Sequence, residues 1–190
     1  KKTEIDTDDA AKLIGCINAL SKRMTMDKDS KQLKEIDPGL MHTALAFCST
    51  IKKSQAITNI FNTYAADYYD TMYEDQLEMV ADVEAQHVDG SMNAMTRQEK
   101  LQWLQETNVN GQDCHILTNV RCMSEGVDVP ALDAIIFLSS RNSQVDVVQS
   151  VGRVMRRAPE SSGYDKKYGY IIIPVVVPSD VEPEIALAKS

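Results

Sequence analysis

A short segment near the carboxyl end of the chain places two arginines, a glutamine and a glycine at helical spacing. Gln149, Gly152, Arg153 and Arg156 fall on one arc of a helical wheel, since each residue of an α-helix advances by about 100°. The apolar side chains of the segment lie on the opposite side. Two guanidinium groups one turn apart, beside a glycine, let an anion such as a phosphate approach closely and accept paired hydrogen bonds. The alternative is that both arginines simply face water.

A second segment, residues 116–130, reads I-L-T-N-V-R-C-M-S-E-G-V-D-V-P. Thr118 and Asn119 end its apolar run, and a threonine hydroxyl at a strand end can donate to a phosphate. Gly126 lets the backbone pass close to a ligand. Asp128 is either a ligand to a polar group or an ordinary turn residue before the Val-Pro pair.

Two further segments carry weaker signals. Residues 42–51 form an apolar run that ends in Ser49 and Thr50, either of which is a candidate phosphate contact or a helix cap. A His-Val-Asp-Gly sequence ends at Gly90, and Arg97 lies in the helical pattern that follows it. Each segment alone is poor evidence, because serine after a strand caps helices more often than it binds phosphate.

Taken in order, the four segments resemble a known motor family. Residues 149–156 resemble motif VI of superfamily-2 helicases and translocases, residues 116–130 resemble motif V, and residues 42–51 resemble motif IV. The His-Val-Asp-Gly sequence and Arg97 look like the H-x-x-G…R segment between motifs IV and V. Among relatives, the E-G-V-D-V-P and Q-x-x-G-R-x-x-R forms look closest to the DEAD/DEAH-type motors of restriction-modification and phage-defence systems.

The resemblance implies a role for each matched residue. Arg153 and Arg156 would act as arginine fingers on ATP. The residues near the nucleotide would be Gly126, Asp128, Gln149 and Gly152, with Asp128 towards the ribose. The residues that contact the nucleic-acid backbone would be Ser49, Thr50, Gly90, Thr118 and Asn119. The implied partners are DNA, with RNA not excluded, and an N-terminal RecA-like lobe.

The pattern of the whole chain predicts the elements that position these residues. Apolar runs predict strands at 40–48, 81–88, 114–120, 132–139 and 168–176, and helical spacing predicts helices at 7–24, 53–70, 96–106 and 145–157. Such alternation predicts an α/β fold with a three-layer parallel sheet, the architecture of a RecA-like helicase C-terminal lobe. We expect residues 1–36 to form a helical extension and linker, and residues 37–190 to form the RecA-like domain.

Composition excludes several classes of protein. A net charge of −8 argues against a broad positive surface for nucleic acid, so any such contact must be local. The most apolar run, near residues 170–177, is far shorter than the roughly 20 residues that span a bilayer. The four cysteines and three histidines have no metal-ligand spacing, so we expect no metal site and a reduced, cytoplasmic protein.

The 190 residues contain no GxxxxGK[ST] loop and no DExH-like acidic box. We therefore expect ATP and Mg²⁺ to be bound mainly by an N-terminal lobe outside this segment, and the fragment alone to be inactive. The alternative is a non-hydrolysing binding or regulatory module derived from a helicase lobe. A dinucleotide enzyme ranks last, because no GxGxxG follows the first strand.

Overall fold

The computed structural model describes most of the chain. The described residues are 7–23, Gln32, 35–108, 111–120, 131–138, Gly152, Lys166 and 168–174. Within them, alternating apolar runs and helical patterns fold into the strands and helices that the sequence predicts.

The centre of the fold is a parallel sheet of five strands. In spatial order these are β2 (Asp82–Val88), β3 (Asp113–Asn119), β1 (Thr43–Phe47), β4 (Ala134–Phe137) and β5 (Tyr170–Ile172). Every neighbouring pair is parallel. The predicted parallel α/β architecture is confirmed.

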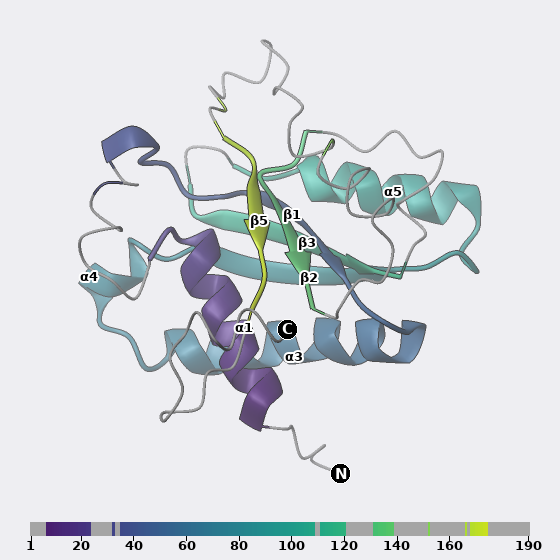
Figure 1. Cartoon of the computed structure of the whole chain (residues 1–190), viewed down its shortest axis with the longest axis horizontal. Coiled ribbons are helices and arrows are strands. Elements are labelled where there is room, and N and C mark those ends of the chain that lie inside the picture. The colour runs from purple at the N-terminus through teal and green to yellow at the C-terminus, as the bar shows by residue number, and fades with distance from the viewer. Residues whose placement is uncertain are drawn as a thin grey trace.

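Helices cover both faces of the sheet (Figure 1). The helices α1 (Thr7–Leu20) and α3 (Ile51–Tyr69) lie on one face, and α5 (Ala94–Gln105) lies on the other. A short helix, α4 (Glu74–Leu77), leads from α3 towards β2. The result is the three-layer arrangement expected of strands that are apolar on both sides.

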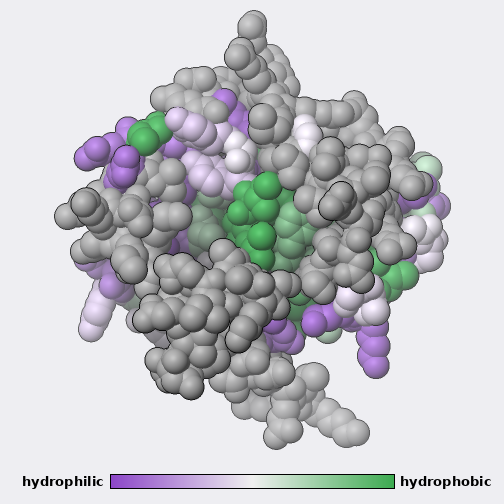
Figure 2. All heavy atoms as spheres, in the orientation of Figure 1, coloured by the Kyte–Doolittle hydropathy of each residue, from purple (hydrophilic) through white to green (hydrophobic). Residues whose placement is uncertain are grey.

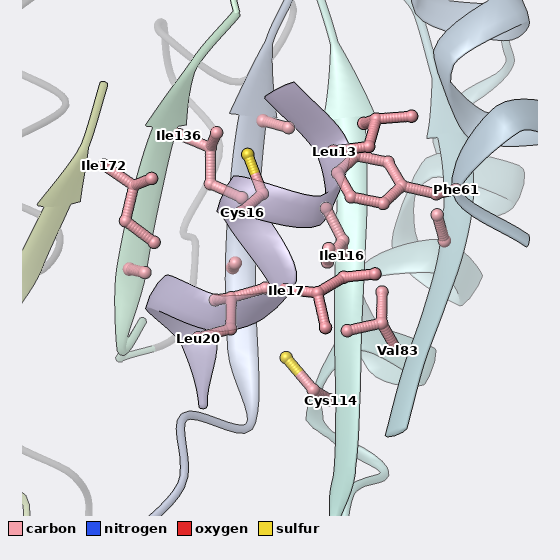
Figure 3. Packing of buried hydrophobic residues seen from close by; sticks show 14 of the residues in the cluster. Leu13, Cys16, Ile17, Leu20, Phe61, Val83, Cys114, Ile116, Ile136 and Ile172 are labelled. Carbon is pink, nitrogen blue, oxygen red and sulfur yellow. The ribbon is translucent and has the colours of Figure 1, made fainter. Parts of the chain in front are cut away.

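Strand side chains alternate between two apolar clusters. On the α1 and α3 side, Ala44 and Ala46 of β1 join a cluster with Ile17 and Phe61 (Figure 3). On the α5 side, Leu45 and Phe47 of the same strand pack with residues such as Leu101. Alanine on one face of the central strand leaves room for two helices to pack there.

Helix α1 belongs to the same hydrophobic core as the sheet. Its residues Leu13, Cys16, Ile17 and Leu20 are at most 1% exposed and point towards the strands (Figure 3). The predicted amphipathic helix is therefore present and packs on the sheet. The division at residue 36 between extension and domain stays a prediction.

A buried ion pair joins a residue just after α1 to the segment before β1, next to the edge strand β5. Lys22 follows α1 with a left-handed φ of 54°, and its side chain is 2% exposed. Its Nζ lies 2.7 Å from Asp37 Oδ2 and 5.3 Å from the centre of the Tyr170 ring. The Tyr170 hydroxyl donates to the same Asp37 oxygen at 2.7 Å. The cluster ties α1, the segment before β1 and β5 together.

Several details differ from or extend the predicted elements. Helix α1 ends at Leu20 where the pattern predicts residue 24, and α5 begins at Ala94 where it predicts residue 96. Helix α3 begins at Ile51, two residues earlier than expected, because Thr50 caps it. Helix α4 was not predicted, since four residues carry no periodic signal. The predicted helix at 145–157 lies outside the described residues apart from Gly152, which is helical.

Strand β5 lies at one end of the sheet and leaves apolar surface in view. Ile171 and Ile173 are 46% and 52% exposed, and Figure 2 shows apolar surface over this strand. Among the helices that the structure describes, none is long and apolar enough to cross a membrane.

Candidate nucleic-acid interface

The carboxyl ends of the three strands β2, β3 and β1 meet at one edge of the sheet. Asn119, the last residue of β3, is level with Val88 on one side and Phe47 on the other. Loops after parallel strands emerge at this edge, where ligands of open α/β sheets bind. The sheet therefore brings together the segments that hold the predicted backbone contacts Ser49, Thr50, Gly90, Thr118 and Asn119.

Three of these five residues lie on the surface. Ser49 and Thr50 are exposed, and Thr50 Oγ1 accepts a hydrogen bond from Lys53 N at 3.1 Å as the cap of α3. Gly90 is exposed, and a Cβ built on it would meet nothing within 4 Å. The capping role of Thr50, one of the two alternatives for this position, is thus present.

Thr118 and Asn119, in contrast, are fully buried. The Thr118 hydroxyl lies 2.6 Å from Thr58 Oγ1 and accepts from Ser54 Oγ at 2.9 Å. Asn119 Nδ2 donates to Ala46 O at 3.3 Å, while its buried Oδ1 has no hydrogen-bond partner. In this conformation neither side chain reaches the surface, and their contact with nucleic acid stays a prediction.

A buried polar cluster lies directly beneath the exposed segments. Ser54 of α3 lies 2.7 Å from His87 Nδ1, and His87 Nε2 lies 2.8 Å from Asp89 Oδ2. Thr118 and Thr58 continue the cluster on the other side of Ser54. All five side chains are less than 10% exposed. We call these residues the His87 cluster.

Both ring nitrogens of His87 are engaged within the cluster, Nδ1 with Ser54 Oγ and Nε2 with the Asp89 carboxylate. Ser54 Oγ also lies 2.9 Å from Thr118 Oγ1, so one serine hydroxyl joins α3 to both β2 and β3.

Asp89 organises the turn that contains Gly90. Its Oδ1 accepts from the Ser91 amide at 2.8 Å and from the Ser91 hydroxyl at 2.5 Å, while Oδ2 faces His87. Hydrogen bonds from Ser91, and then from His87, lower the pKa of Asp89 from 3.8 to about 2. The carboxylate is thus ionised at neutral pH and fixes the backbone on both sides of Gly90.

The order Ser54, His87, Asp89 superficially matches a hydrolase triad, but the chemistry does not fit. Ser54 is 0% exposed, so no substrate carbonyl can reach its oxygen. The Ser54 oxygen is also hydrogen-bonded to Thr118 within the cluster. The set holds elements in place and offers no nucleophile.

A hollow at the opposite edge of the sheet is a poor match for nucleic acid. It lies at the starts of β2 and β3, and its lining includes Asp82, Glu84 and Asp113. Three carboxyl groups would repel phosphates. In the described part of the chain, no cluster of three or more metal-ligating side chains occurs.

The predicted nucleotide-binding residues fall almost wholly outside the described residues. These are Gly126, Asp128, Gln149, Arg153 and Arg156. Gly152 is exposed, with nothing within 4 Å of a Cβ built on it. The sequence prediction missed Ser54 and Asp89, which have no motif signal of their own beyond the Asp in His-Val-Asp-Gly.

Comparisons with known proteins agree with the parallel α/β fold. Residues 27–158 match the family model described as the helicase conserved C-terminal domain. The chain is 35% identical to the ATP-dependent type ISP restriction-modification enzyme LlaBIII, solved bound to DNA, with a TM-score of 0.70. That alignment covers 96% of this chain and 11% of the enzyme chain.

A second structure shares the fold at lower identity. The Mss116p structure bound to ssRNA and AMP-PNP is 13% identical, with a TM-score of 0.50, and covers 87% of this chain and 25% of its own. None of the curated proteins matches the chain.

Proposed function

We propose that this chain, which belongs to the family of helicase conserved C-terminal domains, is the second motor lobe of an ATP-dependent nucleic-acid translocase or helicase. The observation that carries the proposal is the 35% identity, over 96% of the chain, with an ATP-dependent restriction-modification enzyme bound to DNA. The chain spans 11% of that enzyme, so the remainder of a motor would be supplied by other parts of the protein.

In the proposed motor, ATP and Mg²⁺ bind mainly to an N-terminal RecA-like lobe, and this lobe completes the site. Arg153 and Arg156 neutralise charge on the transferred phosphoryl group, a contribution of about 10³ to 10⁵ in rate for arginine fingers. Asp128 and Gln149 face the nucleotide, together with the backbone at Gly126 and Gly152.

The proposed nucleic-acid contacts lie at the carboxyl edge of the sheet. Ser49, Thr50 and Gly90 are exposed there. Two lysines, Lys52 and Lys53, occupy the first turn of α3 beside them, and no acidic residue shares that turn. A cation at a helix N-terminus is unfavourable by about 0.3 to 1 kcal/mol, so helix stability does not explain these lysines. Local attraction of phosphates explains the two lysines, and such a local contact is compatible with a net charge of −8.

Thr118 and Asn119 have a different part in the proposal. Both side chains are buried, so they support the interface from within by joining the end of β3 to α3 and to β1. The main-chain carbonyl of Asn119 accepts from Cys48 N at 2.9 Å, which joins the end of β3 to the segment that carries Ser49.

The test is hydrolysis of ATP by the complete protein that carries this chain, measured with and without single-stranded and double-stranded DNA and RNA. We expect a rate that one of these nucleic acids stimulates. If ATP is not hydrolysed under any of these conditions while nucleic acid still binds, the chain is a binding or regulatory module and the motor proposal is wrong.

A further inference from the structure

The His87 cluster connects the three segments to which backbone contacts are assigned. Ser54 lies in the first turn of α3, where its amide donates to Thr50 O at 2.9 Å. Asp89 immediately precedes Gly90, and Thr118 precedes Asn119. One side chain, His87, bonds to the α3 group through Nδ1 and to the turn after β2 through Nε2.

Stability alone does not account for this arrangement. A buried polar pair adds little net stability when compared with apolar residues of similar volume, because desolvation offsets the attraction. An apolar residue at position 87 would pack equally well against α3, as Val83 and Ala85 of the same strand do. An apolar residue would not, however, fix the distance between the α3 cap, Thr50, and the turn that contains Gly90.

We infer that His87 is a positioning residue for nucleic-acid binding: by linking Ser54 to Asp89, it holds the α3 cap and the Gly90 turn in the relative position that one nucleic-acid strand requires. The inference rests on the proposed function. His87 itself does not touch the strand, since its side chain is 9% exposed and both ring nitrogens are engaged within the cluster.

The hydrogen bond from His87 to Ser54 and the one to Asp89 can be removed separately. In His87→Gln, the terminal amide lies near the position of Nε2, so it keeps a donor for Asp89 and loses the one for Ser54. In His87→Asn, the amide lies near the position of Nδ1 and keeps only the bond to Ser54. Ser54→Ala removes the same bond from the other side, together with the bond between Ser54 and Thr118, with little change in volume.

The matched control is His115→Gln. His115 is also 9% exposed and also bonds through a ring nitrogen, with Nδ1 2.7 Å from Trp103 O, but it lies near the amino end of β3. A purely structural role would give the same result at both histidines: a lower midpoint of unfolding and unchanged affinity in the folded fraction.

The measurement is the concentration of nucleic acid that gives half-maximal ATPase activity in the complete protein, together with kcat at saturation. We expect His87→Gln, His87→Asn and Ser54→Ala each to raise that concentration about tenfold, the effect of losing one buried hydrogen bond, while kcat and the KM for ATP stay unchanged. Ser54→Ala combined with His87→Gln should be no worse than Ser54→Ala alone, because the Ser54 substitution has already removed the bond between the two residues. His115→Gln should leave the concentration unchanged.

Other outcomes separate the two claims. If the wild-type protein is stimulated by nucleic acid and all three variants keep its affinity, or if the Ser54 and His87 effects add, His87 does not position the interface and the proposed function stands. If nucleic acid neither binds to nor stimulates the wild-type protein, the proposed function and the inference fall together.

Discussion

Replacing Asp37 with alanine should leave the ammonium group of Lys22 buried without its carboxylate. Lys22 is 2% exposed at its side chain, and removing one partner of a buried pair costs about 3 to 5 kcal/mol. Asp37 is 16% exposed, and its main-chain carbonyl still accepts from Lys22 Nζ at 3.1 Å after the substitution. Both facts reduce the loss, so we expect a decrease of about 3 kcal/mol in the free energy of unfolding.

The assay is urea unfolding followed by circular dichroism, with the double-mutant cycle that includes Lys22→Met. Once Lys22 carries no charge, Asp37→Ala should cost less than about 1 kcal/mol, because only the hydrogen bond from Tyr170 is removed. A loss below about 1 kcal/mol for Asp37→Ala alone, or an equal loss in both backgrounds, would refute the reasoning that buried charge makes this cluster strong.

Three further predictions test other parts of the structure. Ile17→Ala should lower the free energy of unfolding by about 2 to 4 kcal/mol, since Ile17 is 1% exposed, while Ala11→Gln on the exposed side of α1 should change it by less than about 0.5 kcal/mol; equal effects in urea unfolding would mean that α1 does not share the core. The pKa of Asp89 is lowered from 3.8 to about 2 in the folded protein. Its contribution of about 1 to 2 kcal/mol to the free energy of unfolding is therefore present above pH 3.8 and is lost as the pH falls towards 2. Asp89→Asn should therefore reduce that part of the pH dependence of unfolding, and an unchanged acid profile would contradict the assignment. Lys52→Ala with Lys53→Ala should weaken binding of single-stranded nucleic acid and reduce the salt slope by about 1.4, or about 0.7 for each phosphate that is no longer neutralised; an unchanged slope would place the strand elsewhere.

The sheet and its helices were predictable because their signal is local. Short apolar runs predict the strands and helical spacing predicts the helices, and both patterns are carried by residues close together in the sequence. The alternation of strands and helices then predicts parallel pairing. The carboxyl edge could also be predicted, since strand ends in a parallel sheet meet there. In the structure, Ser49, Thr50 and Gly90 are exposed and follow strands that end at this edge, while their contact with nucleic acid stays a prediction.

The His87 cluster could not be predicted, because its partners are far apart in sequence. Ser54 and His87 are 33 residues apart, and Ser54 and Thr118 are 64 apart. Ser54 looks like one more polar residue of a helix until α3 packs against β2 and β3. The same holds for Thr118, whose motif position predicts a phosphate contact while its place in the sheet buries it.

The contacts of Lys22 were missed for a related reason. The sequence places residue 22 near the end of a predicted helix and gives its side chain no partner, yet in the structure Lys22 meets Asp37 and the ring of Tyr170. Asp37 and Tyr170 are 133 residues apart, so only the assembled sheet brings them together.

The proposed role of this lobe is to supply arginines to an ATP that another lobe holds. It can be measured as kcat for nucleic-acid-stimulated ATP hydrolysis by the complete protein carrying Arg153→Ala or Arg156→Ala, compared with the wild type and with Arg157→Ala as a charge-matched control. We predict that each finger variant lowers kcat by about 10³-fold or more while nucleic-acid binding and folding are retained, and that the control stays near the wild-type rate. If either finger variant hydrolyses ATP at the wild-type rate, that arginine is not a finger and the proposed role is wrong.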